Sequence, residues 1–374
     1  MIIYLSLLIP VLAALVLLVF FRHRMAWFEY SIPFAVSMIL IVASKTITEG
    51  MQTHDKEFWG SNVRYAEYYE DWNEYIHATC YRQVACGTDS KGNTKYCSEP
   101  YDCSYVDYHF AYCEITTTSK EVLSISSGEY VRLMQQFGNQ EFVELNRKYH
   151  TDDGDKYVTV WRGGRETAQP VVTEHSYENR VQASDDVFNF PRVSKEDVVF
   201  YGLHDYPKVR NYSCRTILGF DDAHAETELR FINGDLGPRK QVRVWVIVFN
   251  GKSRDTGLLQ EAYWKGGNKN EFVVTIGIDS LTRKVQWCYP FSWTEVQRLK
   301  IDVRNFVESQ NELDLLALAS FLEINLDQSF VRKQFADFNY LTVEPPLSAV
   351  LFTFVLTILV NAGVSWWAIK NELE

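Results

Sequence analysis

The two ends of this chain lack charged side chains. No Asp, Glu, Lys or Arg occurs from Met1 to Phe21 or from Leu347 to Ile369. Each stretch provides the roughly 20 apolar residues that cross a ~30 Å hydrocarbon core as a helix. A soluble core does not require such long uncharged runs. Their presence excludes an ordinary soluble domain and predicts a membrane span at each end.

The first apolar run also lacks the basic residues that open a secretory signal peptide. Such a peptide carries Lys or Arg before its apolar core and a small-residue cleavage site after it. Here Phe20-Phe21-Arg22-His23-Arg24 follows the run instead, so we expect no cleavage. A second apolar stretch, Trp27–Ala43, follows at once. We expect a transmembrane helical hairpin, and an interfacial or re-entrant second helix is the alternative.

Basic residues near the spans predict their orientation. Arg22 and Arg24 lie in the short loop of the hairpin, and Lys370 lies at the end of the last span. Short cytoplasmic loops carry an excess of Lys and Arg. These three residues are therefore expected on the cytoplasmic side, which places residues 47–346 outside the cytoplasm.

No cysteine occurs in the apolar runs, and no Cys-x-x-Cys pair occurs anywhere. The absence of a Cys-x-x-Cys pair disfavours a standard zinc knuckle. Metal binding is kept as a minority alternative because His77 and His109 lie close to Cys80 and Cys113. Five cysteines fall within 34 residues, in a polar segment that gains most from covalent crosslinks. The total of seven leaves a free thiol, and Cys288, in an apolar run, is expected to be free and buried. The disulfide candidates are Cys80, Cys86, Cys97, Cys103, Cys113 and Cys214.

The chain has few basic residues for its size, and its net charge is −11. The ends and spans contribute four basic and three acidic residues, so the middle of the chain carries about −12. This charge makes nucleic acid and anionic lipid headgroups poor partners for the outer domain as a whole. Cations and basic protein surfaces suit it better.

The first part of the outer region predicts few elements. Tyr and Trp recur every three or four residues from Arg64 to His77, which predicts an amphipathic helix. Lys91-Gly92-Asn93 predicts the tip of a hairpin. Residues 163–240 carry no pattern that predicts a fold. The remaining elements expected are helices near Gly128–Phe137 and Glu141–Arg147 and a strand at Tyr157–Trp161.

Residues 241–342 carry a clear α/β pattern. Continuous apolar runs predict buried strands, and longer amphipathic segments with stop signals predict helices. The first crossover between parallel strands is expected to be right-handed. In chain order the elements are strand Val242–Phe249, helix Asp255–Trp264, strand Glu271–Gly277, strand Lys284–Tyr289, and helices Thr294–Ser309 and Glu312–Asn325.

This order of elements resembles the TPM-domain family of thylakoid-lumen and membrane-anchored bacterial proteins. The resemblance covers about residues 238–335 and rests on an apolar strand, a helix ending near a Trp, a Gly/Lys/Asn-rich turn into a second strand, and an Arg-containing hairpin strand. A membrane span downstream is also similar to many bacterial members. The residues concerned are Val242–Phe249, Trp264, Gly266-Gly267-Asn268-Lys269-Asn270, Phe272–Ile276 and Arg283-Lys284-Val285-Gln286-Trp287.

The resemblance implies two activities, because some family members are acid phosphatases and some bind calcium through loop carboxylates. Oxygen ligands of that kind suit calcium. Asp and Asn are also ordinary turn and cap residues, and Asp255 suits the N-cap of its helix. No phosphate-binding loop, Gly-x-Ser-x-Gly elbow or His-Glu-x-x-His motif occurs. The candidate metal ligands are Asn250, Asp255, Asn270 and Asp279, with Asn268 in the same loops.

The sequence thus predicts an integral membrane protein of mixed α+β and α/β class. It would present an acidic, disulfide-containing extracytoplasmic domain for assembly with other proteins or with itself, with no catalytic set evident. A TPM-like phosphatase or calcium-binding activity is the alternative, and a channel or transporter component ranks third because the spans lack paired charges. The predicted parts are the hairpin (residues 1–46), a cysteine-containing region of unassigned fold (47–234), a TPM-like α/β domain (235–342) and a C-terminal transmembrane helix (346–369).

Overall fold

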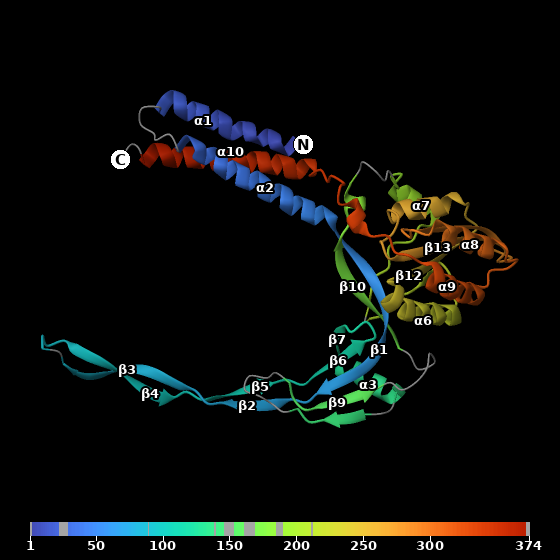
Figure 1. Ribbon diagram of the computed structural model, residues 1–374, viewed down its shortest axis with the longest axis horizontal. Helices are drawn as coiled ribbons and strands as arrows, with labels where there is room; N and C mark the ends of the chain where they lie inside the picture. The colour runs from blue at the N-terminus through green and yellow to red at the C-terminus, as the bar shows by residue number, and fades with distance from the viewer. Residues whose placement is uncertain are drawn as a thin grey trace.

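The computed structural model describes residues 2–21, 29–88, 90–137, 140–145, 153–160, 169–184, 190–210 and 212–371. It combines three long apolar helices with a mixed α/β body. A narrow two-stranded arm extends from the body on the side opposite to the helices α6, α7, α8 and α9 (Figure 1). Each of these three parts follows from a different stretch of the sequence.

The apolar helices are α1 (Leu8–Phe21), α2 (Ile32–Thr53) and α10 (Leu347–Asn371), each long and apolar enough to cross a membrane. Short 3-10 helices, Ile2–Leu7 and Glu29–Ser31, precede the first two. The three run side by side in Figure 1. Asn361 Nδ2 donates to Ser37 Oγ at 2.8 Å, and the hydroxyls of Ser44 and Thr353 lie 2.5 Å apart. Such polar contacts join helices within apolar surroundings.

Three apolar helices at the two ends of the chain confirm that part of the prediction. The second is longer than expected, because α2 continues ten residues beyond Ala43 to Thr53. Polar side chains near its end find partners outside the bundle; Glu49, for instance, lies 2.8 Å from Arg180. The predicted cytoplasmic residues Arg22 and Arg24 lie outside the described residues, and Lys370 lies in the last turn of α10.

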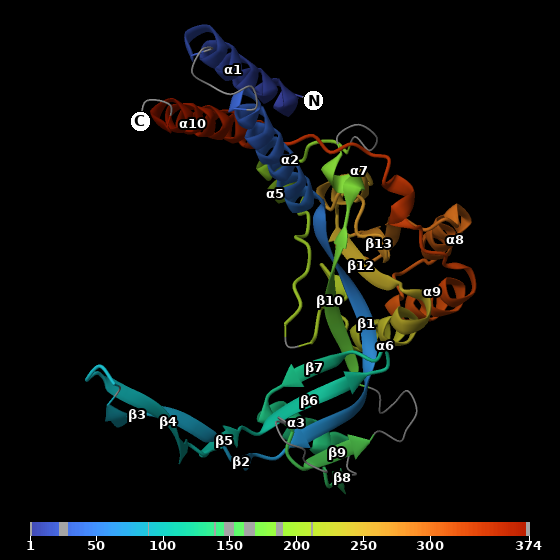
Figure 2. The ribbon, with the colours of Figure 1, turned by 60° about the vertical axis from the view of Figure 1, so that its left-hand side comes forward.

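Strand β1 (His54–Tyr69) continues directly from α2 and runs the length of the body (Figure 2). Its first half pairs with β10 (Pro170–Glu178), and its second half lies between β6 and β9. The sheet has the order β7-β6-β1-β9-β8, and α3 packs against it. The remaining members are β6 (Tyr112–Thr117), β7 (Val122–Ile125), β8 (Gln140–Val143), β9 (Lys156–Val160) and α3 (Ser127–Phe137).

The helix predicted for Arg64–His77 is wrong, because these residues form the second half of β1 and the strand β2 (Trp72–Ile76). Aromatic residues are also enriched in strands. Adjacent residues such as Ala66 and Glu67 are both buried in β1, so burial there does not follow a helical or a two-residue period. Glu67, within this segment, is buried with Lys156 Nζ 2.5 Å away. The helix predicted at Glu141–Arg147 is also wrong, since residues 141–143 lie in β8 and residues 144–145 are not helical. Helix α3 and strand β9 confirm the other two predictions.

The predicted α/β unit forms a four-stranded sheet of order β11-β12-β13-β14, in which the first three strands are parallel and β14 is antiparallel. Val244, Val246 and Val248 face a core made with α6, α8 and α9. Trp245 and alternate residues face α7 and the β1–β10 ribbon. The elements are β11 (Ile217–Leu218), β12 (Arg243–Asn250), β13 (Glu271–Ile278), β14 (Val285–Ser292), α6 (Ala223–Lys240), α7 (Asp255–Tyr263), α8 (Gln297–Glu308) and α9 (Leu315–Ser329).

The order of elements predicted after residue 241 is confirmed, whereas the polar region before it contains elements that no pattern indicated. Helix α6 spans the predicted boundary at residue 235, and its Leu229 and Ile232 belong to the main core. Phe58 and Val172, far earlier in the chain, share the second core with Trp245. The two outer regions therefore fold together. The smaller elements are α4 (Arg180–Ala183), α5 (Lys195–Tyr201) and a 3-10 helix at Phe335–Phe338.

Strand β1 touches α6 at a point where both carry glycine. A Cβ atom added at Gly60 would lie 2.2 Å from the carbonyl oxygen of Asn233, and one at Gly237 would lie 2.0 Å from the carbonyl oxygen of Gly60. Both atoms are backbone and cannot move aside cheaply. Beside this contact, Asn62 Nδ2 donates to Asp235 Oδ1 at 3.0 Å. The close approach of the two backbones thus requires glycine at both positions, because any side chain would clash.

Replacing Gly60 by Ala should destabilise the body by about 1–3 kcal/mol, because the methyl group forces the strand away from α6. Thermal unfolding of the full chain in detergent measures the change. Gly128→Ala is the matched control, since its nearest neighbour would lie 3.9 Å away. Equal unfolding temperatures for the two variants would contradict the close contact.

Candidate functional site

An exposed arm, defined here as the described residues among 72–109, extends from the body. Strand β2 pairs with β5 (Tyr105–His109) next to the body, and β3 (Thr79–Thr88) pairs with β4 (Thr94–Asp102) beyond it. The turn of the second hairpin includes Lys91-Gly92-Asn93, as the sequence predicted. Both ribbon views show the arm leaving the body as a single narrow projection (Figures 1 and 2).

The outer hairpin of the arm is exposed on both faces. None of the described residues of β3 and β4 is buried. An isolated two-stranded hairpin is at best marginally stable in water, so burial of apolar surface does not explain this one. Aromatic side chains nevertheless cover the arm, and exposed aromatic groups typify contact surfaces. They are Tyr75, Tyr81, Tyr96, Tyr101, Tyr105, Tyr108 and, just beyond it, Phe110.

Two disulfides hold the outer hairpin together. Cys80 bonds to Cys103 at its base, and Cys86 bonds to Cys97 nearer its tip. Both pairs are centred on the same point of the sequence, between Lys91 and Gly92, as expected for bonds across one hairpin. The crosslinks replace the hydrophobic core that the arm lacks.

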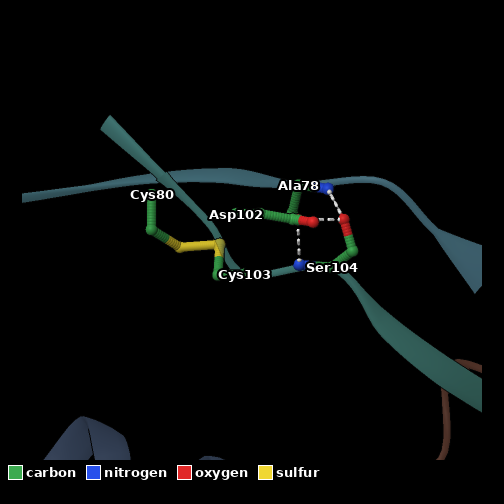
Figure 3. The surroundings of a disulfide bond; sticks show 5 residues. All are labelled: Ala78, Cys80, Asp102, Cys103 and Ser104. Carbon is green, nitrogen blue, oxygen red and sulfur yellow. Dashed lines mark hydrogen bonds between the residues drawn. A yellow bond between two sulfur atoms is a disulfide. The ribbon is translucent and has the colours of Figure 1, made fainter.

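Figure 3 shows how the base of the hairpin is fixed around the Cys80–Cys103 disulfide. The Ala78 amide donates to Ser104 Oγ at 3.2 Å, and the Ser104 amide donates to Asp102 Oδ1 at 2.9 Å. The Cys103 amide donates to the Ala78 carbonyl at 3.0 Å. The hydrogen bonds from Ser104 lower the pKa of the Asp102 carboxyl. These contacts lie where the chain passes from one ladder of the arm to the next.

The inner ladder of the arm is tied by paired side chains. His109 Nε2 lies 3.2 Å from Glu74 Oε2, and the His109 ring stacks on Trp72 with a centroid distance of 4.6 Å. Tyr108 donates to Asp71 at 2.8 Å. His109 is thus engaged by a carboxylate rather than by a cysteine, and Cys80, near His77, is in a disulfide. Among the described residues, no group of three His, Cys, Asp or Glu side chains could hold a metal.

The prediction that Cys113 and Cys214 form disulfides requires correction, because both are free and buried. Cys113 lies in the core beneath α3, with Ser127 Oγ 4.0 Å from its sulfur. Cys214 lies in the separate core that contains Trp245. Cys288 is free and buried, as predicted, in a third core. Burial raises the pKa of all three thiols. Each is isolated from other cysteines by its own core.

The structure does not bring the four predicted metal ligands together. Asn250 is the last residue of β12, Asp279 follows the neighbouring parallel β13, and Asp255 begins α7 at the same end of the sheet. The sequence predicted Asp255 as the N-cap of this helix, but the N-cap is Arg254. Asn270 precedes the eight-residue β13 and therefore lies roughly 25 Å away.

Two of these residues form hydrogen bonds within the fold, which explains why polar side chains occur at these positions. Asp279 Oδ1 closes a turn by accepting from the amides of Leu281 and Thr282, at 3.1 and 2.9 Å, and these bonds lower the pKa of its carboxyl. Asn270 Nδ2 donates to the Phe58 carbonyl at 2.7 Å and so ties β1 to the α/β sheet. Turn and strand-bridging contacts therefore account for both side chains.

A buried polar cluster, which the sequence did not indicate, joins the ribbon to the sheet. Glu271 accepts from Trp245 Nε1 and from the Asn268 amide, both at 2.8 Å, and from Tyr206. Burial raises the pKa of its carboxyl. The Arg243 guanidinium lies 4.4 Å from the Trp245 ring centroid. The side chains of Trp245, Arg243 and Glu271 are buried, so the cluster stabilises the fold.

No protein-family model, curated protein or solved structure matches this chain. The resemblance to TPM domains stays a prediction.

Removing the disulfides should loosen the arm and leave the body intact. In the chain-entropy description, closing loops of these lengths contributes about 3 kcal/mol each. We expect trypsin to cleave the Cys80→Ser/Cys103→Ser variant at Arg82 and Lys95 at least tenfold faster than the native chain. The unfolding temperature of the body should not change, because the arm packs on none of its cores.

The matched control is Cys113→Ala, which removes a free thiol and should leave cleavage of the arm at the native rate. If the double serine variant resisted trypsin like the native chain, the crosslinks would not be what holds the hairpin.

Proposed function

We propose that this protein is a membrane-anchored binding protein that presents its arm to a protein partner outside the cytoplasm. The single observation that carries the proposal is the arm itself: a doubly crosslinked hairpin with aromatic side chains exposed on both faces. A hairpin of this kind contributes nothing to the cores of the body. Its rigidity is useful for contact with another molecule.

The cysteines and the basic residues support the location. Structural disulfides persist in oxidising compartments and are rare in the cytosol. Arg22, Arg24 and Lys370 favour a cytoplasmic side for the loop of the hairpin and for the end of α10. With three spans, that orientation places the body and the arm together on the opposite side.

The chemistry of the arm suits a protein surface. Tyrosine provides a large contact area with a polar tip and loses little side-chain entropy on binding. The backbone groups along the outer edges of β3 and β4 are also free to pair with an added strand. The net charge of about −12 on the outer region favours a basic partner at long range.

Thiol labelling in intact cells tests the location. The three native free thiols are buried, so a cysteine introduced at Ser90, exposed near the hairpin tip, provides the reporter. A membrane-impermeant maleimide should label Ser90→Cys in intact cells. A cysteine at Asn371, the end of α10, should react only after lysis. The reverse pattern would place the arm in the cytoplasm and contradict the proposal.

Site-specific photo-crosslinking tests the contact. A photoreactive phenylalanine at Tyr96, on the arm, should give one discrete protein adduct in native membranes. The same group at Leu281, which is 93% exposed on the body, is the matched control and should give none. The Tyr96 adduct should fall at least fivefold when Cys86 and Cys97 are replaced by serine, because the hairpin then loses its fixed shape.

Three outcomes contradict an arm-directed contact. They are equal adducts from Tyr96 and Leu281, a Tyr96 adduct that persists without the disulfide, and no adduct from any aromatic position of the arm.

A further inference from the structure

A second surface feature lies near the point where β1 leaves α2. It is a cleft of about 860 Å³ between the start of the β1–β10 ribbon and the segment that follows α7. This volume falls within the range of small-molecule sites. The cleft is separate from the arm, which begins beyond the other end of β1.

Contacts between the apolar helices indicate the depth of this cleft relative to a bilayer. Ser44 of α2 lies beside Thr353 of α10, and Ser37 lies beside Asn361, so the two helices run antiparallel. The first residue of α10, Leu347, is therefore level with about residue 50 of α2. His54, at the edge of the cleft, lies about 6 Å farther along the axis at 1.5 Å per residue. A lipid headgroup layer is about 5–8 Å thick on each side. With the hydrocarbon boundary at Leu347, the first residue of the uncharged run, the cleft opens at headgroup level.

The charges at the cleft leave two ammonium groups available. Lys208 and Lys265 line the cleft, are exposed, and have no ion pair among the described residues. Lys56 is held by Glu174. Asp55 accepts from Asn179 Nδ2 at 2.7 Å and from Tyr177 at 3.2 Å, and it keeps its negative charge because both donors are neutral. The five Asp, Glu and Lys side chains that line the cleft therefore sum to +1, although the outer region as a whole is acidic.

Fixed aromatic side chains form one wall of the cleft. The Tyr263 hydroxyl donates to Asp205 at 2.6 Å, and Trp264 Nε1 donates to the His204 carbonyl at 2.7 Å. The ring of Tyr206 lies 5.0 Å from that of Trp264. Amphipathic rings of this kind favour the interface between headgroups and acyl chains. The wall provides apolar contact next to the two lysines.

We propose that this cleft binds the anionic headgroup of a phospholipid from the adjoining leaflet. Lys208 and Lys265 pair with the headgroup charge, and the aromatic wall contacts the glycerol backbone and the first carbons of the acyl chains. Each lysine near an anionic lipid surface contributes about 1 kcal/mol, which is roughly fivefold in affinity. The bound lipid would hold the body against the membrane surface beside α2.

Calorimetric titration of the purified full chain in neutral detergent tests the proposal with three probes. These are dihexanoyl phosphatidylglycerol, dihexanoyl phosphatidylcholine and inorganic phosphate. We expect phosphatidylglycerol to bind at least tenfold more tightly than either of the others. Lys208→Gln/Lys265→Gln should weaken that binding about tenfold or more.

The matched control is Lys120→Gln/Lys284→Gln, two exposed lysines that do not line the cleft. It should bind phosphatidylglycerol within twofold of the native chain. Thermal unfolding of both variants verifies that they fold. Equal binding of phosphatidylcholine, equal binding of inorganic phosphate, or full affinity in the Lys208/Lys265 variant would each overturn the proposal. Equal binding of phosphate would point to a soluble anion.

Discussion

Strand β1 crosses helix α6 at a place where glycine hydrogens separate the two backbones, and the other parts of the molecule depend on that crossing. The same strand begins at the end of α2, pairs with β10, occupies the centre of the six-stranded sheet and leads into the arm. Through Gly60 and Asn62 it is fixed to α6, which in turn packs on the four-stranded sheet. One contact therefore sets the position of the apolar helices and of the arm relative to the body.

Features that depend on neighbouring residues could be predicted from the sequence. The apolar spans, the strands β12 and β13, the helix α3 and the hairpin tip each carry a local pattern of hydrophobicity or turn residues. The helix predicted at Arg64–His77 failed because its evidence was also local. Glu67 is accommodated in a sheet only because Lys156, 89 residues later, lies beside it. No periodicity within the segment contains that information.

The cysteines show the same division between local and distant information. The spacing of Cys80, Cys86, Cys97 and Cys103 is symmetrical about the Lys91-Gly92 turn, so the two bonds of the arm could have been paired from the sequence. Nothing local distinguishes Cys113 and Cys214, whose separation follows from the packing of two different cores. The positions of the predicted metal ligands also depend on distant parts of the chain. The register of β12 and β13 places Asn250 near Asp279, whereas Asn270 lies at the opposite end of β13.

The arm and the bundle of apolar helices leave the body toward the same side (Figures 1 and 2). A two-stranded ribbon with open edges cannot enter hydrocarbon, because its outward N–H and C=O groups would find no partner there. Charged Arg82 and Lys95 add to this cost. An open ribbon of this kind therefore has to stay in water or at the lipid surface, and hydrocarbon excludes it.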